Sequence, residues 1–400
     1  MNTLTNTLKK LYSGSSRKAV VAVVAAVAVL IVGFATMASR ASGFFAATEA
    51  EAGTLSGNVH LVSDSAAAGG TAVQFTAPVT GGGGGGGTGG GGSTGTNPYP
   101  DRWSVGAPGV AHYNQTQANL PVPAGYTVVS GNGTPGEWDI YDCSSPVVYD
   151  HYYFKAFIYI GTNCSGSITI KNSIIAPPAG TRQRSILNNS SGGVNLTIQD
   201  STIRPEPVPL GGTNDALTDH MVNGCGSTCH VTLTRLDVSN SGGMCLCGEN
   251  TLVQYSWLHD AYVAHLPDPS LAHTGGVFPI GGTGPVEVSH SRLEPGFNVG
   301  TGTEVTNYWQ AITAVLFTQP GDGGPQLRNY NVHDNFISLG AYDMALQEGI
   351  GIIVKNNVFG PSHWGAANCS GGCSVTYADW SSNVLGDING VPSTSVVNHP

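Results

Sequence analysis

The sequence predicts an all-β protein whose main part is a parallel β-helix, and three observations support this. A seven-residue phrase recurs along the chain with an apolar second position and a polar centre. The 400 residues include 57 glycines and 23 prolines, and only 10% are charged, a composition typical of proteins with many turns. Outside one apolar N-terminal segment, no convincing stretch follows the helical period of 3.6 residues.

The repeated phrase predicts the coil of the solenoid. Alternating apolar residues around a two-residue polar corner indicate a strand, a tight bend and another strand. Such short strands cannot bury a face alone, so the coils must stack. The copies are TIKNSII (169–175), TIQDSTI (197–203), a weaker TLTRLDV (232–238), LVQYSWL (252–258), EVSHSRL (287–293), NVHDNFI (331–337) and IVKNNVF (353–359). Their second positions are Ile170, Ile198, Leu233, Val253, Val288, Val332 and Val354.

The spacing of the copies also favours a solenoid. The intervals are 28, 35, 20, 35, 44 and 22 residues, which indicates a bare coil of roughly 20–25 residues with loops inserted into some coils. Stacked corners predict a polar ladder of Asn172, Asp200, Asn335 and Asn357, because Asn and Asp bond local backbone groups and tolerate positive φ. A β-propeller is the rival architecture, but it needs four strands per period and more even spacing.

Residues 19–38, AVVAVVAAVAVLIVGFATMA, predict a transmembrane signal-anchor helix. Twenty residues without charge or proline span about 30 Å as a helix, the thickness of a bilayer core. Four basic residues precede the segment, so residues 1–18 are expected to be a cytoplasmic tail of a single-pass cell-membrane protein with its C-terminal domain outside. Cleavage before Ser39, which would release a secreted chain, is the alternative.

Two segments separate the membrane from the repeats. Within residues 39–80, Ala47–Phe75 contains EAE, LSG and AGG and resembles the start of β-sandwich carbohydrate-binding modules. About thirty residues match, too few to close a sandwich, so this segment is expected to be a truncated stalk with a β-hairpin. Residues 81–98 are mostly glycine and predict a flexible linker. The β-helix domain is expected over residues 99–400.

Residues 99 to about 390 resemble bacterial secreted proteins with a right-handed parallel β-helix, the pectin-lyase-like fold. The stretches that carry the resemblance are SVGAPGV…LPVPAGYTVV, SGSITIKNSII and LVQYSWLHD. The resemblance implies a right-handed coil and a groove directed at polysaccharide. It does not choose an activity, because this fold hosts lyases, hydrolases, epimerases and non-catalytic adhesins.

The eight cysteines are expected to form disulfides, as in other exported chains. The alternative is a zinc site in the CxxxC…CxC region, whose thiolates suit that metal. The expected pairs are Cys143–Cys164, Cys225–Cys229 and Cys369–Cys373. The zinc alternative would use Cys225, Cys229, Cys245 and Cys247, and the disulfide pairing of Cys245 and Cys247 stays open.

The charge balance excludes nucleic acid as a partner. Five of the 15 basic residues lie in the first forty positions, so the rest of the chain has ten basic and 25 acidic residues, or about −15. A phosphate backbone needs a basic face. Neutral polysaccharides fit this charge, as do acidic ones if a cation such as Ca²⁺ bridges them.

The densest group of reactive side chains lies in WLHDAYVAHLPDPSLAHTGGV, residues 257–277, expected as a long loop between strands. A pectate-lyase-like polysaccharide lyase would need a base beside a uronate and a cation on its carboxylate. The candidate bases are His259, His273 and Arg235, and the candidate Ca²⁺ ligands are Asp219, Asp260 and Asp268. The candidate sugar-stacking aromatics are Trp257, Tyr262, Tyr308 and Trp309.

One departure from the resembling proteins favours a function without catalysis. Their phrase often reads like His-x-Asp-Gly-Ile-Gln, whereas this chain has Gly275 in place of the acid and Phe278 in place of the amide. The missing acid could have bound a cation or acted in catalysis. Two hypotheses therefore remain: a polysaccharide lyase or related glycan-active protein, and a non-catalytic adhesin or structural glycan-binding protein.

Overall fold

The computed structural model describes residues 59–63, 71–75, 98–112, 122–178, 185–188, 193–206, 220–223, 229–241, 243–261, 274–279, 282, 284–299, 301–304, 312–318, 327–369 and 374–400. Residues 1–93 and 94–400 form two separate units. In the first, β1 (Val59–Ser63) and β2 (Thr71–Phe75) pair as an antiparallel hairpin. The predicted membrane segment and nearly all of the glycine linker lie outside the described residues. Within the described ranges, no helix is long and apolar enough to span a membrane.

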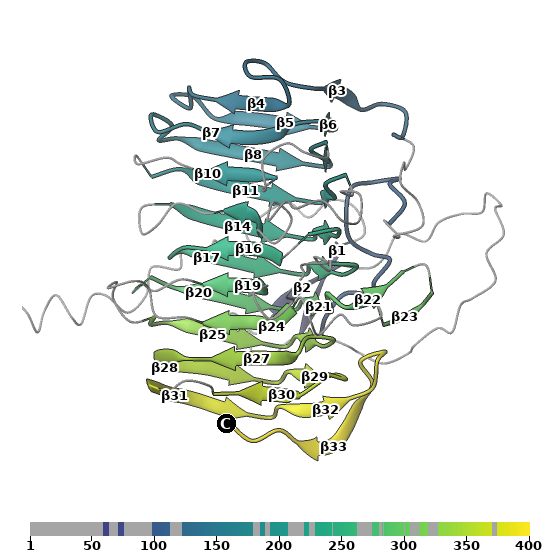
Figure 1. The fold of residues 1–400 in the computed structure, drawn as a ribbon, viewed down its shortest axis with the longest axis vertical. Coiled ribbons are helices and arrows are strands. Elements are labelled where there is room, and N and C mark those ends of the chain that lie inside the picture. Colours follow the sequence, from purple (N-terminus) through teal and green to yellow (C-terminus); the bar gives the residue numbers. More distant parts are fainter. Residues whose placement is uncertain are drawn as a thin grey trace, which may run out of the picture. The chain divides into compact units, whose positions relative to one another are not determined.

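The second unit contains three long sheets. Within each sheet the strands lie one above another along the vertical axis of Figure 1. The β4–β30 sheet comprises β4 (Glu137–Ile140), β7 (Phe157–Ile160), β10 (Ile186–Asn188), β13 (His220–Asn223), β16 (Gly243–Cys247), β19 (Thr274–Pro279), β24 (Ile312–Thr318), β27 (Tyr342–Leu346) and β30 (Gly365–Asn368). The β5–β31 sheet comprises β5 (Val147–Asp150), β8 (Ser167–Lys171), β11 (Asn195–Gln199), β14 (His230–Thr234), β17 (Thr251–Gln254), β20 (Val286–Ser289), β25 (Tyr330–His333), β28 (Glu348–Lys355) and β31 (Ser374–Ser381).

The third sheet, β3–β33, consists mainly of very short strands. It comprises β3 (Thr127–Val129), β6 (Tyr152–Phe154), β9 (Ile174–Ile175), β12 (Thr202–Ile203), β15 (Asp237–Val238), β18 (Trp257–Leu258), β21 (Arg292–Leu293), β26 (Phe336–Ile337), β29 (Val358–Phe359), β32 (Val384–Gly386) and β33 (Pro392–Val396). Its strands pair in parallel except for β33, which lies antiparallel on β32 at the C-terminal end. A separate hairpin joins β22 (Phe297–Asn298) to β23 (Thr303–Glu304).

From β4 to β32, successive strands belong in turn to the β4–β30, the β5–β31 and the β3–β33 sheet. Among the described residues, only the β22–β23 hairpin interrupts this order. Each strand therefore pairs with its equivalent in the next coil, which is the arrangement of a parallel β-solenoid. This confirms the predicted all-β class and the stacking of coils. A propeller is excluded, because its strands would pair within one blade rather than with the next repeat.

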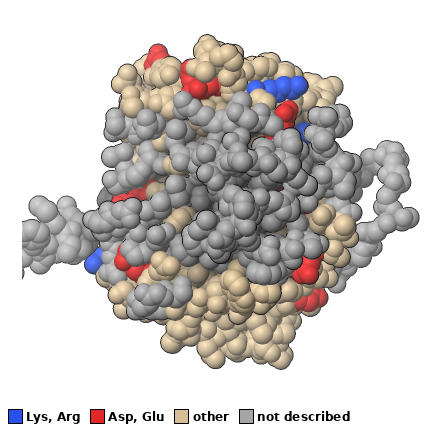
Figure 2. Space-filling model, in the orientation of Figure 1, with Lys and Arg blue, Asp and Glu red and all other residues tan. Residues whose placement is uncertain are grey.

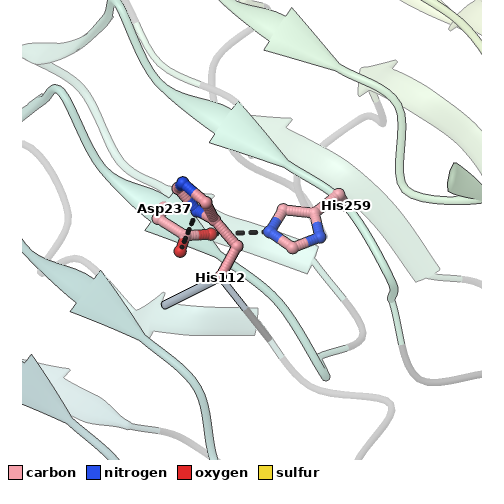
Figure 3. Close-up of side chains that lie close together, drawn as sticks. All are labelled: His112, Asp237 and His259. Carbon is pink, nitrogen blue, oxygen red and sulfur yellow. Dashed lines mark hydrogen bonds and ion pairs between the residues drawn. The ribbon is translucent and has the colours of Figure 1, made fainter. Parts of the chain in front are cut away.

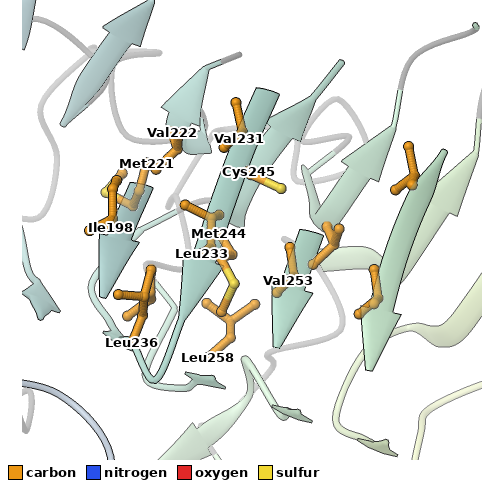
Figure 4. Packing of buried hydrophobic residues seen from close by; sticks show 14 of the residues in the cluster. Ile198, Met221, Val222, Val231, Leu233, Leu236, Met244, Cys245, Val253 and Leu258 are labelled. Atoms are coloured by element: carbon orange, nitrogen blue, oxygen red, sulfur yellow. The ribbon is translucent and has the colours of Figure 1, made fainter. Parts of the chain in front are cut away.

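The seven repeated phrases form one corner of the solenoid, as predicted. Each phrase spans the end of a strand in the β5–β31 sheet, a bend, and a strand of the β3–β33 sheet. The apolar second positions pair with one another from coil to coil and are completely buried. They belong to one continuous core, part of which Figure 4 shows around Leu233, Met244 and Val253.

The two residues of the bend at this corner have different structural roles. The first residue of each bend has a positive φ, as in Asn172 (48°) and Asn356 (54°), and its N–H donates to a carbonyl in the next coil. The second residue, which is polar in every copy except Leu236, carries the buried ladder. Asn335 N–H donates to Asn357 Oδ1 (3.1 Å), and Asn357 N–H donates to Asn383 Oδ1 (3.1 Å).

The predicted ladder was therefore right in two coils and displaced by one residue in two others. Asn335 and Asn357 do lie in the ladder. Asn172 and Asp200 instead occupy the positive-φ position, and the ladder residues of their coils are Ser173 and Ser201, with Ser173 N–H donating to Ser201 Oγ (3.1 Å). Asn and Asp tolerate positive φ, so these residue types fit either position and the sequence alone does not separate them.

Candidate functional site

An N-terminal strap, defined here as residues 98–112, lies along the outer face of the β3–β33 sheet. Tyr99 packs on Phe336 and Val358 of β26 and β29. Farther along the strap, Ala107 packs on Ile174 in β9, so the strap passes across many coils. It covers side chains of this sheet that would otherwise expose apolar surface to water.

Two features hold the middle of the strap. The Arg102 guanidinium makes a bidentate ion pair with the buried Glu294 carboxylate, at 2.6 and 2.8 Å, and lies 3.8 Å from the centre of the Phe297 ring. Burial opposes the charge of Glu294, but Arg292 and Arg102 outweigh it and lower the pKa of this carboxyl. Gly106 has φ +97°, and a Cβ there would lie 2.7 Å from the Cβ of Asp237. The strap can lie this close to β15 only because residue 106 is glycine.

His112 of the strap joins a chain of alternating imidazoles and carboxylates, three members of which appear in Figure 3. His112 Nδ1 lies 2.8 Å from Asp237 Oδ2, and His259 Nε2 lies 2.6 Å from Asp237 Oδ1. His259 Nδ1 lies 2.8 Å from Asp260 Oδ2, which also accepts the N–H of Val299 (2.9 Å). Because ionised carboxylates only accept hydrogen bonds, both ring nitrogens of His259 donate and the ring is an imidazolium.

Indole rings surround this cluster. The Trp257 ring stacks on His259 with 3.7 Å between ring centres, and His112 and Trp103 approach Trp257 edge-on. The side chains of His259 and Asp237 have exposures of 0% and 1%, whereas His112 retains 13%. Solvent therefore reaches the cluster only at its His112 end in the described part of the chain.

The charges of the cluster stabilise one another. Burial alone would lower the pKa of His259, but the negative charge and hydrogen bond of Asp237, together with Asp260, raise it to about 9. Burial would raise the pKa of Asp237, but the charge of His259 and the bonds to both imidazoles hold it well below its usual range. At neutral pH His259 is thus a cation between two carboxylates.

A second surface, the outer face of the β5–β31 sheet, is polar and partly exposed. Its outward side chains form two rows in register across seven coils, each row about 29 Å long at 4.8 Å per strand. The first row is Thr169, Thr197, Thr232, Leu252, Glu287, Asn331 and Ile353, in which Leu252 and Ile353 are apolar. The second row is Lys171, Gln199, Thr234, Gln254, Ser289, His333 and Lys355, in which Ser289 is completely buried.

Hydrogen bonds within this polar face hold several side chains in place. Gln254 Nε2 donates to Glu287 Oε1 (3.0 Å) and to Ser289 Oγ (3.1 Å). His333 lies beside Glu287, lowers its pKa and has its own pKa raised by the contact. At the adjoining corner, the Tyr255 and His290 rings stack in parallel with 5.0 Å between their centres. Figure 2 shows a view in which described charged side chains are few and scattered.

The predicted catalytic and metal residues are only partly brought together. His259 and Asp260 are in contact, but both are buried. Arg235 lies at the exposed corner in a bidentate ion pair with Asp200 rather than in the cluster. Trp257 is completely buried and so offers no ring face to a sugar, contrary to its predicted role. The remaining predicted residues lie outside the described ranges: His273, Tyr262, Tyr308, Trp309, Asp219 and Asp268.

The disulfide between Cys143 and Cys164 is present, as predicted. Cys229, Cys245 and Cys369 are also disulfide-bonded, while Cys225 and Cys373 lie outside the described residues. Two members of the alternative zinc set, Cys229 and Cys245, are thus not available as thiolates.

Sequence reasoning missed His112 and Asp237. His112 belongs to a segment without the repeat, and it meets Asp237 across 125 positions. One signal was available: Asp237 is the only acid at its position among the seven repeated phrases, where the other copies have Ile174, Thr202, Trp257, Arg292, Phe336 or Val358.

Searches of family models, curated proteins and solved structures found no match to this chain. The two surfaces above, the buried cluster and the polar face, are therefore the basis for inferring function.

Proposed function

We propose that this protein is a right-handed parallel β-helix that binds an extended polysaccharide along the outer face of its β5–β31 sheet, outside the cytoplasm and without cleaving it. The observation that carries the proposal is the pair of in-register polar rows. Sugar polymers present hydroxyl groups at regular intervals, and amide, hydroxyl and carboxylate side chains repeated along a flat face can bond them in series.

The geometry of the rows supports a polymer rather than a small ligand. The seven coils extend about 29 Å, whereas a small-molecule site is a concave pocket that buries most of its ligand. The stacked rings of Tyr255 and His290 border the rows, and Tyr255 is 41% exposed, so it offers an aromatic surface to a sugar ring. Right-handedness follows the strong preference of parallel crossover connections.

Binding is favoured over a lyase activity by the state of the described candidate bases. His259 is buried and carries its proton at neutral pH, so it cannot remove one from a substrate. Arg235 is exposed, but its guanidinium is paired with Asp200 and its pKa is raised by that pairing. A raised pKa makes deprotonation harder, which is the opposite of what a catalytic base requires.

The N-terminal segments complete the proposal. A signal anchor at residues 19–38 would hold the chain in the cell membrane, and the glycine linker would tether the β-helix at a distance of roughly 20–25 Å by random-coil scaling. Ca²⁺ would have a role if the polysaccharide is acidic, because the chain itself is acidic and the cation would bridge the two.

The test is affinity electrophoresis of the full chain in gels containing neutral or acidic polysaccharides, with and without Ca²⁺. We expect retardation by at least one polymer and at least about tenfold weaker binding when both Thr197 and Thr232 are replaced by arginine, since two bulky charges interrupt the first row. The matched control is Thr394→Arg, an exposed threonine in β33 on another sheet.

Two results would count against the proposal. If no polysaccharide retards the folded chain, or if the control variant weakens binding as much as the double variant, the polar face is not the binding surface. Appearance of unsaturated products that absorb ultraviolet light would instead support the lyase hypothesis and contradict binding without cleavage.

A further inference from the structure

We propose that His112, Asp237 and His259 form a structural zinc site that fastens the N-terminal strap to the solenoid. This inference is independent of polysaccharide binding. One potential ligand atom from each residue lies within 4.8 Å of the other two. Two imidazoles and a carboxylate are donors that Zn²⁺ binds, and a water molecule at the partly exposed His112 side would complete a tetrahedron.

The three ligands come from different parts of the fold. His112 ends the described strap, Asp237 begins β15, and His259 follows β18 in the next coil. An ion held by all three would therefore join the strap to two successive coils. It would act as a crosslink, which stabilises the closed arrangement by binding the folded state and not the unfolded chain.

The surroundings of His259 match those of a metal-bound imidazole. Histidine ligands usually donate their second N–H to a carboxylate, which fixes the ring and its tautomer. Here Asp260 accepts from Nδ1 of His259 at 2.8 Å and is itself held by the Val299 N–H, so Nε2 points at Asp237. Asp260 is a positioning residue in this arrangement.

Only small movements would admit the ion. Zinc bonds of about 2.1 Å place tetrahedral ligand atoms about 3.4 Å apart. The N···O contacts of Asp237 to the two imidazoles are 2.8 Å at Oδ2 and 2.6 Å at Oδ1, so the contact to the oxygen that binds the ion must open by about 0.6–0.8 Å. Rotation of the His112 ring and of the Asp237 carboxylate can supply this.

The charge of the cluster favours a cation. Asp237 and Asp260 are both buried and lie on either side of the His259 ring. A divalent ion would bring positive charge to this buried acidic pair, and buried charges are tolerated when they are paired. The described chain has one other such group, His290, His333 and Asp334, but its side chains are partly exposed and His290 Nδ1 is bonded to the Pro98 carbonyl.

The experiment uses the full chain without a polyhistidine tag or reductant, since tags and free thiols also bind zinc. After dialysis against a chelator, the protein is titrated with Zn²⁺ by calorimetry, and Co²⁺ is added separately to observe the visible absorption of a tetrahedral site. We expect one ion per chain, a higher Tm with Zn²⁺, and no such ion in His112→Gln. Asp260→Asn should weaken binding about 10–100-fold while leaving the stoichiometry unchanged.

The matched control is His333→Gln, which removes a histidine from the exposed group and should leave the zinc titration unchanged. Near-ultraviolet circular dichroism verifies that each variant is folded, and His112 is the ligand least buried in the cluster. The proposal is overturned if the wild-type chain binds no zinc, if the ion still binds in His112→Gln, or if binding disappears in His333→Gln. In each of these cases the cluster is a hydrogen-bonded network alone.

Discussion

Replacing Asn357 with alanine tests how much the buried ladder stabilises the solenoid. Asn357 Oδ1 accepts the backbone N–H and the side-chain amide of Asn335, at 3.1 and 3.0 Å. Its own amide donates to the Val332 carbonyl and to Asn383 Oδ1, both at 3.0 Å. Asn357→Ala would thus leave a buried N–H, a buried carbonyl and part of two side-chain amides without partners.

The expected loss can be estimated from these groups. Each buried polar group left unsatisfied costs about 1–3 kcal/mol, and the ladder is completely buried, so we expect the opening free energy of these coils to fall by about 3–5 kcal/mol. Native-state hydrogen exchange is the suitable assay, because a stack of coils opens locally as well as globally. The amides of β25 to β29 should lose protection first.

The control is the preceding residue, Asn356, which is exposed and has φ 54°. Asn356→Ala places a less tolerant residue at positive φ and should cost only about 1–2 kcal/mol. The reasoning is wrong if the two variants lose similar protection, because the ladder bonds would then contribute no more than a local backbone preference.

Three further predictions concern the strap and the disulfide. In chelator-treated protein, protonated His259 stabilises the folded state, because its pKa rises from 6.5 in the unfolded chain to about 9 in the folded one. This contribution of about 3 kcal/mol is fully present below about pH 6.5 and should be lost as the pH rises through 9. Urea unfolding at pH 6 and pH 10 measures the difference in unfolding free energy. Gly106→Ala should loosen the strap and speed its hydrogen exchange, whereas Gly109→Ala, also at positive φ but with no atom near its Cβ, should do so much less. Replacing Cys143 and Cys164 by serine should lower the unfolding free energy by about 3 kcal/mol, given their separation of 21 residues; an unchanged urea midpoint would show that the bond adds nothing.

The coil could be predicted from sequence because its signal is local. In β8 the core-facing residues Ile168 and Ile170 are two positions apart, and the polar bend follows directly, so a short stretch of sequence reveals strand, bend and strand. The repetition strengthens this pattern, because each copy packs against the equivalent residues of the neighbouring coils and so needs the same apolar and polar positions. The position of Asn172 within the bend was predicted wrongly, because the same polar residue types occur at both bend positions. Only the first position has a positive φ, and the sequence does not show which residue takes it.

The strap could not be predicted in the same way. Residues 98–112 do not repeat, and many of their partners lie far away in the sequence, such as Thr202 for Ala107 (95 positions) and Gly390 for Tyr99 (291 positions). The glycine-rich linker predicted that the β-helix domain begins near Tyr99, but not how the residues there pack. The residues around His112 in the sequence do not indicate that it contacts a carboxylate. That contact depends on the path of the strap across the β3–β33 sheet.

The difference between two faces of the solenoid follows from the repeated phrase itself. Its residues before the bend alternate, so outward positions such as Thr169 and Gln199 are polar and the β5–β31 face can meet water uncovered. After the bend, the outward position is often large and apolar, as in Ile174, Trp257 and Phe336, and all three are buried under other parts of the chain. The strap is therefore required by the pattern of the β3–β33 sheet, and the polar rows of the β5–β31 sheet form the face that the proposed polysaccharide would contact.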